Sequence, residues 1–296
     1  MTRVLVSGGT GFVGRFIVEH LLARGYDVLV GARTPPAPAL FSRPVAFIPL
    51  TLDPDVDQSA AFRGVDHFVH AAFQHVAGRY RGGEGGDPEG FRRANLDGSL
   101  RLFKTARHEG VRRCVFLSSR AVYGEQPRGA ALLEETPCHP QSLYGALKLE
   151  AEQMLSGLAT DAFATTSLRV TGVYGPCGHE GAHKWQSLFD DYLSGRAVEP
   201  RAGTEVHGDD VASAVRLTLE VPVGGLSAGV FNVSDILIDY NAILAIVRDL
   251  TGCGHALPGR AAVTAFNAMN TGKIKALGWQ PGGFGRLRET IGTLLA

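Results

Sequence analysis

The sequence has few cysteines and no excess of either charge, and each lack excludes a class of protein. The four cysteines form no C-x-x-C motif, which argues against a disulfide framework and against a four-thiolate metal site. The 29 Lys and Arg residues balance the 29 Asp and Glu residues. A protein that binds nucleic acid or an anionic membrane surface through charge would be strongly basic, so we expect neither partner.

Long apolar runs are also missing. No uncharged apolar stretch approaches 18 residues, and the apolar run Val4–Val6 is too short for the core of a signal peptide. We therefore expect a cytoplasmic protein that acts on a small molecule. Glycine, in contrast, is abundant: 38 of 296 residues, about 13%, against a usual ~7%. This indicates tight turns or a backbone that closely approaches a ligand.

Short β-branched runs alternate with helical stretches through residues 1–171. This rhythm predicts an α/β protein with a Rossmann-like, doubly wound parallel sheet, completed by parts of residues 207–235. The rhythm breaks after Val170, and residues 172–208 look rich in loops. We expect residues 172–296 to form a smaller, interwoven part that binds the substrate. The strands predicted for the first half are Val4–Val6, Asp27–Val30, Val45–Ile48, Val65–Ala72, Arg113–Ser118 and Thr165–Val170.

A glycine-rich turn joins the first strand to the first helix. Gly8, Gly11 and Gly14 are spaced so that the chain can turn sharply and the helix can pack closely on the strand. The backbone N–H groups at the helix start, including those of Phe12 and Val13, would face a pyrophosphate, and the helix dipole favours its charge. The motif and its context predict a dinucleotide site.

The end of the second strand indicates which dinucleotide binds. A carboxylate commonly stands about 20 residues after the glycines and holds the adenosine ribose hydroxyls. Here the chain reads Val30-Gly31-Ala32-Arg33, without a carboxylate. Arg33 could instead receive a 2′-phosphate, so the sequence favours NADP over NAD.

Three further residues form a candidate acid/base set. Ser119 ends the fifth predicted strand, at the carboxyl edge where such sheets bind ligands. Tyr144 and Lys148 are four residues apart on a predicted helix and share a face. An ammonium near a phenol stabilises the phenolate, so Tyr144 can exchange a proton with a substrate hydroxyl or ketone while hydride moves to or from a nicotinamide. Ser119 would hydrogen-bond the same oxygen, and Lys148 would also hold the nicotinamide ribose.

These motifs together resemble the extended short-chain dehydrogenase/reductase family, in its NAD(P)-dependent epimerase/dehydratase branch. The resemblance runs nearly end to end and implies that His70, Ala71, Ala72, Asn95 and Val170 lie beside the cofactor. It also implies a homodimer formed through the Asn95 and Tyr144 helices. The matching segments are SGGTGFVG (7–14), HAA (70–72), NLDGSLRL (95–102), SSRAVYG (118–124), HPQSLYGALKLEAE (139–152), LRVTGVYGP (168–176), VHGDDVASA (206–214), FNVSD (231–235) and LGWQP (277–281).

Two departures from the family pattern bear on function. Dehydratases of the family carry Asp-Glu after the strand-end hydroxyl residue, whereas Arg120-Ala121 stand here, so we do not expect a 4,6-dehydratase. Residues 172–208 also lack an evident cluster of Arg and aromatic residues for a nucleotide diphosphate. The candidate substrate-binding residues are Arg120, Tyr123, Thr171 and His207, although His207 could equally cap a helix.

Three functions stay open at this point. The main prediction is an NAD(P)-dependent oxidoreductase that moves hydride between the nicotinamide and a carbonyl or hydroxyl carbon. One alternative is a nucleotide-sugar epimerase that retains its cofactor, and another is a non-catalytic nucleotide-binding sensor. No metal is expected, because Gly178 and Gly181 argue against a helix that would bring His179 and His183 together. The glycine-rich segment 78–90 is either a flexible lid or a plain loop.

Overall fold

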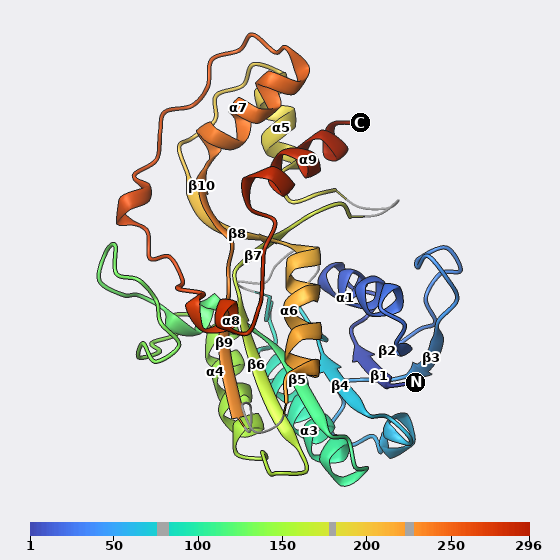
Figure 1. Ribbon diagram of the computed structural model, residues 1–296. Coiled ribbons are helices and arrows are strands. Elements are labelled where there is room, and N and C mark those ends of the chain that lie inside the picture. Colours follow the sequence, from blue (N-terminus) through green and yellow to red (C-terminus); the bar gives the residue numbers. More distant parts are fainter. Residues whose placement is uncertain (76–82, 178–181, 223–227) are drawn as a thin grey trace.

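The computed structural model describes residues 1–75, 83–177, 182–222 and 228–296. Its main sheet has seven strands in the order β3-β2-β1-β4-β5-β6-β9, all parallel (Figure 1). This confirms the predicted Rossmann-like sheet. The strands are β1 (Arg3–Ser7), β2 (Asp27–Ala32), β3 (Ala46–Pro49), β4 (His67–His70), β5 (Arg113–Ser119), β6 (Ala164–Val170) and β9 (Ala228–Val233).

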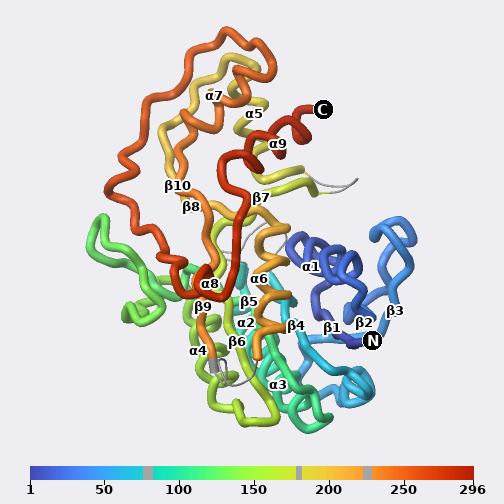
Figure 2. The backbone as a smooth tube through the Cα atoms, in the orientation of Figure 1, coloured from blue at the N-terminus to red at the C-terminus, as the bar shows by residue number. Residues whose placement is uncertain are grey.

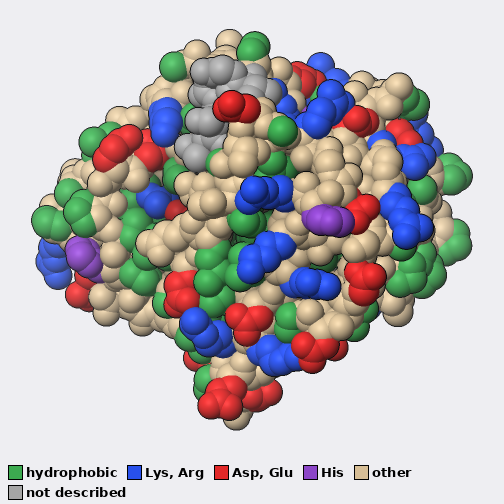
Figure 3. Space-filling model, turned by 90° about the horizontal axis from the view of Figure 1, so that it is seen from below, with side chains coloured by type: hydrophobic (Ala, Val, Ile, Leu, Met, Phe, Trp, Pro, Cys, Tyr) green, Lys and Arg blue, Asp and Glu red, His purple; other side chains and the backbone are tan. Residues whose placement is uncertain are grey.

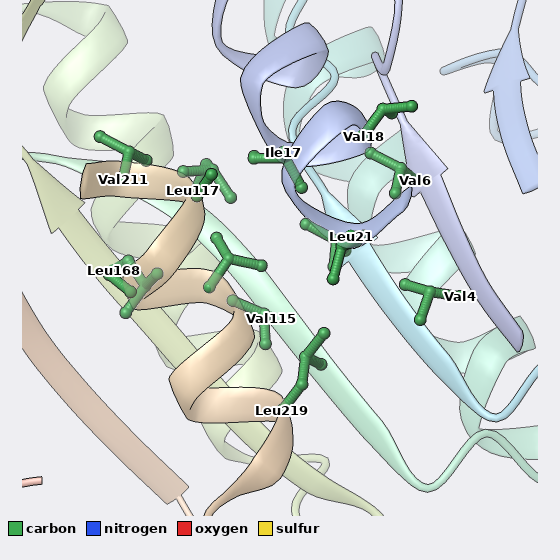
Figure 4. Packing of buried hydrophobic residues seen from close by; sticks show 14 of the residues in the cluster. Val4, Val6, Ile17, Val18, Leu21, Val115, Leu117, Leu168, Val211 and Leu219 are labelled. Carbon is green, nitrogen blue, oxygen red and sulfur yellow. The ribbon is translucent and has the colours of Figure 1, made fainter. Parts of the chain in front are cut away.

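Helices cover both faces of the main sheet. The apolar side chains of β1 alternate between the two faces, so both faces have to be covered. Val4 and Val6 join the core under α1 (Phe12–Ala23) and α6 (Gly208–Glu220), as Figure 4 shows, whereas Leu5 joins the core on the opposite face. The opposite face is covered by the helices α2 (Pro88–Arg92), η2 (Arg93–Gly98), α3 (Ser99–His108) and α4 (Leu143–Ser156), with η1 (Ser59–Phe62) beside them. Each face therefore has its own apolar core.

The strand register brings the strand ends to one edge. Ser7 pairs with His70, and His70 with Phe116, while Ser119 pairs with Val170 one strand further along. The glycine turn after β1, the segment after β4 and the turn after β5 therefore all leave the sheet at its carboxyl edge. Ligands bind at this edge in open α/β sheets.

A second, smaller sheet takes two of its strands from residues 172–208, where the sequence predicted mainly loops, and the third from further along the chain. It contains β7 (Gly172–Tyr174), β8 (Ala202–His207) and β10 (Ile236–Asp239); β8 pairs parallel to β7 and antiparallel to β10. Around it pack α5 (Gln186–Leu193), α7 (Tyr240–Thr251) and α9 (Gly283–Leu295), which Figure 2 shows above the main sheet. β7 has three residues and β8 contains Gly203, so neither carries a clear alternating pattern.

The chain crosses between the two sheets more than once. After β8 it returns to the main sheet as α6 and β9, and α8 (Gly272–Ala276) packs beside β9. Two short helices, η3 (Arg120–Tyr123) and η5 (Val263–Ala265), lie in the connecting segments. The two parts are therefore interwoven.

The surface fits the zero net charge. Seen from below, acidic and basic side chains are interspersed, with apolar groups between them (Figure 3). The ion pair Arg3–Asp27 joins β1 to β2, and the ion pair Arg112–Asp66 joins the residues just before β5 and β4. Among the described residues, no helix is both long and apolar enough to cross a bilayer.

Candidate active site

The turn after β1 forms a tight cradle. Gly8 has a φ of 69°, and a Cβ there would lie 2.7 Å from the backbone of Ala72, after β4. A Cβ on Gly14 would collide with the Gly8 carbonyl oxygen. Gly11 caps α1 without a side chain, and the first turn of α1 holds no acidic residue. The N–H groups that open α1, at Phe12 and Val13, therefore face a space suited to an anion, and the cradle fits a pyrophosphate.

An apolar wall and one cation lie at the end of β2. Leu50, after β3, is 5% exposed, and its backbone N–H donates to the Ala32 carbonyl at 2.9 Å. Its side chain lies against Gly31, where a Cβ would come within 2.8 Å. Arg33 follows as an exposed residue and, within the described part of the chain, forms no ion pair. No carboxylate stands at residue 32 or 50 to meet the adenosine ribose.

The helix α4 begins close to the turn that follows β5. Ser142 caps it, since its Oγ accepts from the Gly145 backbone N–H at 3.2 Å. A Cβ on Gly145 would lie 2.6 Å from the Ala121 carbonyl oxygen. Gly145 therefore lets the first turn of α4, which carries Tyr144, lie directly against the turn that carries Ser119.

Lys148 points into the protein. Its side chain is buried, and Nζ donates to the Leu117 carbonyl at 2.6 Å. The ammonium lies 4.6 Å from the ring centres of both Phe73 and Phe116, and 5.9 Å from that of Tyr144. Burial lowers the pKa of Lys148 to about 7, although the nearby charge of Glu152 opposes this shift.

Ser119 and Phe73 complete the surroundings of Tyr144. The Phe73 ring meets the Tyr144 ring edge to face, with centres 5.0 Å apart. The Ser119 Oγ accepts from the Ala121 backbone N–H at 3.1 Å, which leaves its own proton available to a substrate oxygen. A half-buried phenol and a buried ammonium thus lie on the helix that packs against the turn after β5, and the Ser119 hydroxyl stands at the carboxyl end of that strand.

The sequence profile of the NAD dependent epimerase/dehydratase family matches residues 4–234, which is most of the chain. The chain belongs to this family. Its members include a UDP-glucose 4-epimerase of Corynebacterium glutamicum, 31% identical over an alignment that covers 94% of this chain and 91% of that protein. A UDP-glucose 4-epimerase of Streptomyces lividans is 35% identical over 217 residues, but the match spans only 64% of its length.

A solved epimerase of the family has the same fold. The UDP-glucose 4-epimerase of Thermus thermophilus, determined in complex with NAD, superposes with a TM-score of 0.79 at 30% identity, over 100% of this chain and 99% of that one. These relatives confirm the resemblance to the epimerase/dehydratase branch. They favour the epimerase alternative over a generic oxidoreductase.

Several residues that the resemblance placed beside the cofactor have internal partners. His70 is 0% exposed, and its ring joins the hydroxyls of Ser7 and Ser99 at 2.6 and 2.9 Å. Burial lowers the pKa of His70 to about 3, so the ring is neutral. Asn95 is buried as well and bonds the backbone of Gln74 and Phe91. Both residues hold the walls of the site in place. Ala71, Ala72 and Val170 lie at the sheet edge itself.

The four candidate substrate residues lie in different surroundings. The Arg120 Nη2 donates to the Asn267 carbonyl at 2.8 Å, and Thr171 donates to the Thr204 carbonyl at 2.8 Å. Tyr123 is 0% exposed and donates to Asn232 at 2.7 Å, so it has no exposed atom with which to meet a substrate. His207 is 5% exposed, and its Nδ1 accepts from the Asp209 backbone N–H, which makes it the N-cap of α6.

Two regions considered from the sequence lie partly outside the described residues. The segment 78–90 is described only from residue 83 onward, and His179 and Glu180 are not described. Among the residues that are, no group of three or more potential ligands could hold a metal. Sequence reasoning missed Phe73 and Gly145, although Phe73 directly follows His70–Ala72 and Gly145 stands between Tyr144 and Lys148.

Proposed function

We propose that this protein is a nucleotide-sugar epimerase that inverts a hydroxyl-bearing carbon, with Tyr144 as the acid/base. The observation that carries the proposal is that the Lys148 ammonium lies 5.9 Å from the centre of the Tyr144 ring, on a helix whose Gly145 packs against the turn that follows Ser119. The family relatives support an epimerase in particular. Arg120 and Ala121 stand where dehydratases of the family carry their Asp-Glu pair, and the Arg120 guanidinium donates to the Asn267 carbonyl.

The cradle residues Gly8, Gly11 and Gly14 would hold the pyrophosphate of a nicotinamide dinucleotide, and Lys148 its nicotinamide ribose. When bound, the nicotinamide accepts a hydride and can return it. Tyr144 would take the proton from the substrate hydroxyl and later give it back. Ser119 would donate its free proton to the same oxygen, and Phe73 would fix the tilt of the phenol ring. The rings of Phe73 and Phe116 keep water from the ammonium of Lys148.

We place the rest of the substrate between the carboxyl edge of β6 and the smaller sheet. Thr171 and Gly172 connect β6 to the first strand of the smaller sheet. Lys184 forms an ion pair with Glu205, and both side chains lie against the Cα of Gly172. This ion pair offers both a donor and an acceptor to a polar substrate. Residues 172–296 would therefore supply most of the contacts that select the substrate, and residues 1–171 most of those to the dinucleotide.

For the cofactor we propose NADP(H) in preference to NAD(H). Arg33 is exposed at the end of β2, while Ala32 and Leu50 leave this end of the site without a carboxylate. The Thermus relative was solved with NAD, and the proposed preference for NADP(H) rests on Arg33, Ala32 and Leu50 of this chain alone.

Cofactor retention tests the proposed reaction. We expect the purified protein to carry tightly bound dinucleotide and to interconvert two epimers of a UDP-hexose without net change in nicotinamide absorbance. Product analysis by NMR would show the inverted carbon. Stoichiometric consumption of added NADPH with a ketone substrate would instead support an oxidoreductase. Binding of dinucleotide without turnover of any candidate would indicate a sensor.

We also propose a homodimer through the outer faces of α3 and α4. Leu102, Phe103, Leu147 and Leu155 are buried within the protomer. Leu100, Leu149 and Met154 are partly exposed, but Leu149 and Met154 also pack against apolar clusters of their own protomer, so Leu100 is the residue that tests the contact. Sedimentation should give a dimer mass, and Leu100→Asp should reduce it to that of a monomer. A concentration-independent monomer mass for the unchanged protein would refute this proposal.

A further inference from the structure

An enclosed ion pair lies one helical turn beyond Lys148, and the function proposed above does not use it. The Arg169 Nη2 donates to the Glu152 Oε2 at 2.8 Å, and its Nε lies 3.1 and 3.2 Å from the two carboxylate oxygens. The two side chains are only 6% and 4% exposed. The Ser118 hydroxyl donates to the same carboxylate. The pair therefore joins α4 to both β5 and β6.

Such a pair is costly as a packing element. Removing two charges from water is strongly unfavourable, and apolar residues of similar volume often stabilise a core as well or better. Arg169 recovers part of this cost, because its Nη1 donates to the Glu134 carbonyl and its guanidinium lies 4.8 Å from the centre of the Tyr123 ring. Burial alone would lower the pKa of Arg169, but its bonds to Glu152 raise it, so the pair stays ionised. A buried carboxylate is thereby fixed at this place.

The carboxylate acts on Lys148 from the same helix. Glu152 follows Lys148 by four residues, so the two side chains emerge on one face of α4. The other polar groups that face Lys148 are the Leu117 carbonyl on β5, Tyr144 on α4 and the neutral His70 on β4. Arg169 on β6 stands behind Glu152. Glu152 is the anion among these groups of the described part of the chain, and its charge opposes the lowering of the Lys148 pKa by burial.

We propose that Glu152 is a positioning residue of the site: its carboxylate keeps Lys148 charged and, through Ser118 and Arg169, fixes α4 against the sheet. Only one part of the inference rests on the proposed function, namely that the site uses the charge of Lys148 to bind a ribose and to stabilise the Tyr144 phenolate. A charged Lys148 can donate to a ribose and stabilise the phenolate of Tyr144, whereas a neutral one does both poorly.

Two variants separate charge from bonding. Glu152→Gln removes the charge and keeps an oxygen to accept from Ser118, whereas Ser118→Ala keeps the charge and removes that bond. We would label the lysines with carbon-13 at Cε, remove any bound dinucleotide, and follow the Lys148 signal by NMR against pH without cofactor or substrate. Lys148→Met assigns the signal, and the other lysines serve as internal controls: Lys104, Lys184, Lys273 and Lys275.

The titration midpoint of Lys148 should fall by about one pH unit or more in Glu152→Gln, because a buried carboxylate one turn away is lost. It should stay near the unchanged protein's value in Ser118→Ala. A midpoint unmoved in Glu152→Gln would overturn the proposal. So would an equal fall in both variants, since that result would mark a purely structural role.

Glu152→Gln leaves Arg169 buried without its partner and could prevent folding. The double variant Glu152→Gln/Arg169→Met removes both charges together. The titration midpoint of Lys148 should still fall in the double variant, because the Glu152 carboxylate on the same face of α4 is gone. The fall should be smaller than in Glu152→Gln, because the positive charge of Arg169 is removed as well. An unchanged midpoint in the double variant would refute the proposal as well.

A second measurement extends the test to ligand binding. Dinucleotide affinity can be measured by fluorescence between about pH 6 and pH 9. As the pH rises, the affinity should begin to weaken at a lower pH in Glu152→Gln than in Ser118→Ala, because Lys148 loses its charge earlier. Because the NMR titration needs neither ligand nor turnover, its result stands even if the protein proves not to be an epimerase.

Discussion

Asn95 and Gln74 bond each other in both directions. The Asn95 Oδ1 accepts from the Gln74 backbone N–H at 2.7 Å, and the Asn95 Nδ2 donates to the Gln74 carbonyl at 2.8 Å. Asn95 thereby supplies to the chain after β4 the two bonds that a neighbouring strand would supply. Phe73, whose ring lies against Tyr144, is the residue just before this clamp.

Asn95→Ala should lower both stability and turnover. The variant loses the bonds to Gln74 and one to the Phe91 carbonyl, at a cost of about 2–3 kcal/mol in the free energy of unfolding. Urea denaturation measures this cost, and faster hydrogen exchange at the Gln74 amide would locate it. Asp97→Ala, an exposed change in the same helical stretch, is the control. Exchange at Gln74 as slow as in the unchanged protein would contradict the clamp.

Gly14→Ala should abolish dinucleotide binding. Alanine normally stabilises a helix relative to glycine by about 1 kcal/mol, but here its Cβ would strike the Gly8 carbonyl oxygen and distort the cradle. Gly285→Ala in α9 is the matched control, because a Cβ there meets no atom within 4 Å. Fluorescence titration should show lost binding in the first variant only. Unchanged affinity in Gly14→Ala would mean that the cofactor lies elsewhere.

Tyr144→Phe should lower kcat by about 10²–10⁴-fold with little change in dinucleotide affinity. The ring still packs on Phe73, so only the proton transfer is lost. Tyr26→Phe is the control. The Tyr26 hydroxyl, in the turn after α1, donates to Glu220 at the end of α6, and its loss should leave full activity. Near-normal turnover in Tyr144→Phe would assign the acid/base role to another group.

Arg33→Ala should erase most of the preference for NADP(H). A charge-assisted bond from Arg33 to a 2′-phosphate contributes about 1.5–3 kcal/mol, or roughly 10- to 150-fold in affinity. Ala32→Asp should reverse the preference, because a carboxylate there accepts from the ribose hydroxyls and repels the phosphate. Titration of both cofactors decides this. Equal or tighter binding of NAD(H) by the unchanged protein would show that Arg33 points into solvent.

Asp210 should make the protein less stable as the pH rises. Burial raises the pKa of Asp210 to about 6, even though the Gly282 backbone N–H and Arg286 favour its charge. The folded state therefore binds a proton that the unfolded state has already released between pH 3.8 and about 6. Over this pH range the titration of Asp210 lowers the free energy of unfolding by up to about 3 kcal/mol.

Denaturation at several pH values checks this effect. Asp210→Asn should show a less negative slope of unfolding free energy against pH between those two values. Asp191→Asn, which changes an exposed side chain paired with Arg196 and away from Asp210, should keep the slope of the unchanged protein. Identical slopes in all three proteins would show that Asp210 does not titrate in this range.

Much of the main sheet could be predicted from the sequence, because its signals are local. The turn at Gly8–Gly14 lies between a strand and a helix that are adjacent in the chain, and Tyr144 and Lys148 are one helical turn apart. The smaller sheet could not be predicted, since its strands are short and pair across long separations: Gly172 lies opposite Glu205.

The surroundings of the site depend on distant contacts too. Tyr123 stands in a motif near Ser119, which suggested a contact with substrate, yet its hydroxyl is bonded inside the protein to Asn232 of β9. The Glu152–Arg169 pair has no signature in sequence, because each residue fits its own helix or strand without the other. Only the folded register of α4 and β6 brings them together.

The late position of β9 has a consequence for synthesis of the chain. All seven residues of β6 are buried in the folded protein, and its outer edge pairs with β9, which begins 58 residues after β6 ends (228 minus 170). Once β6 has left the ribosome, its outer edge therefore stays unpaired until that whole stretch has emerged as well. Unpaired strand edges pair with other chains, so we expect the nascent protein to be most prone to aggregate in this interval. A holdase chaperone present during translation should therefore raise the soluble yield more than one added after release.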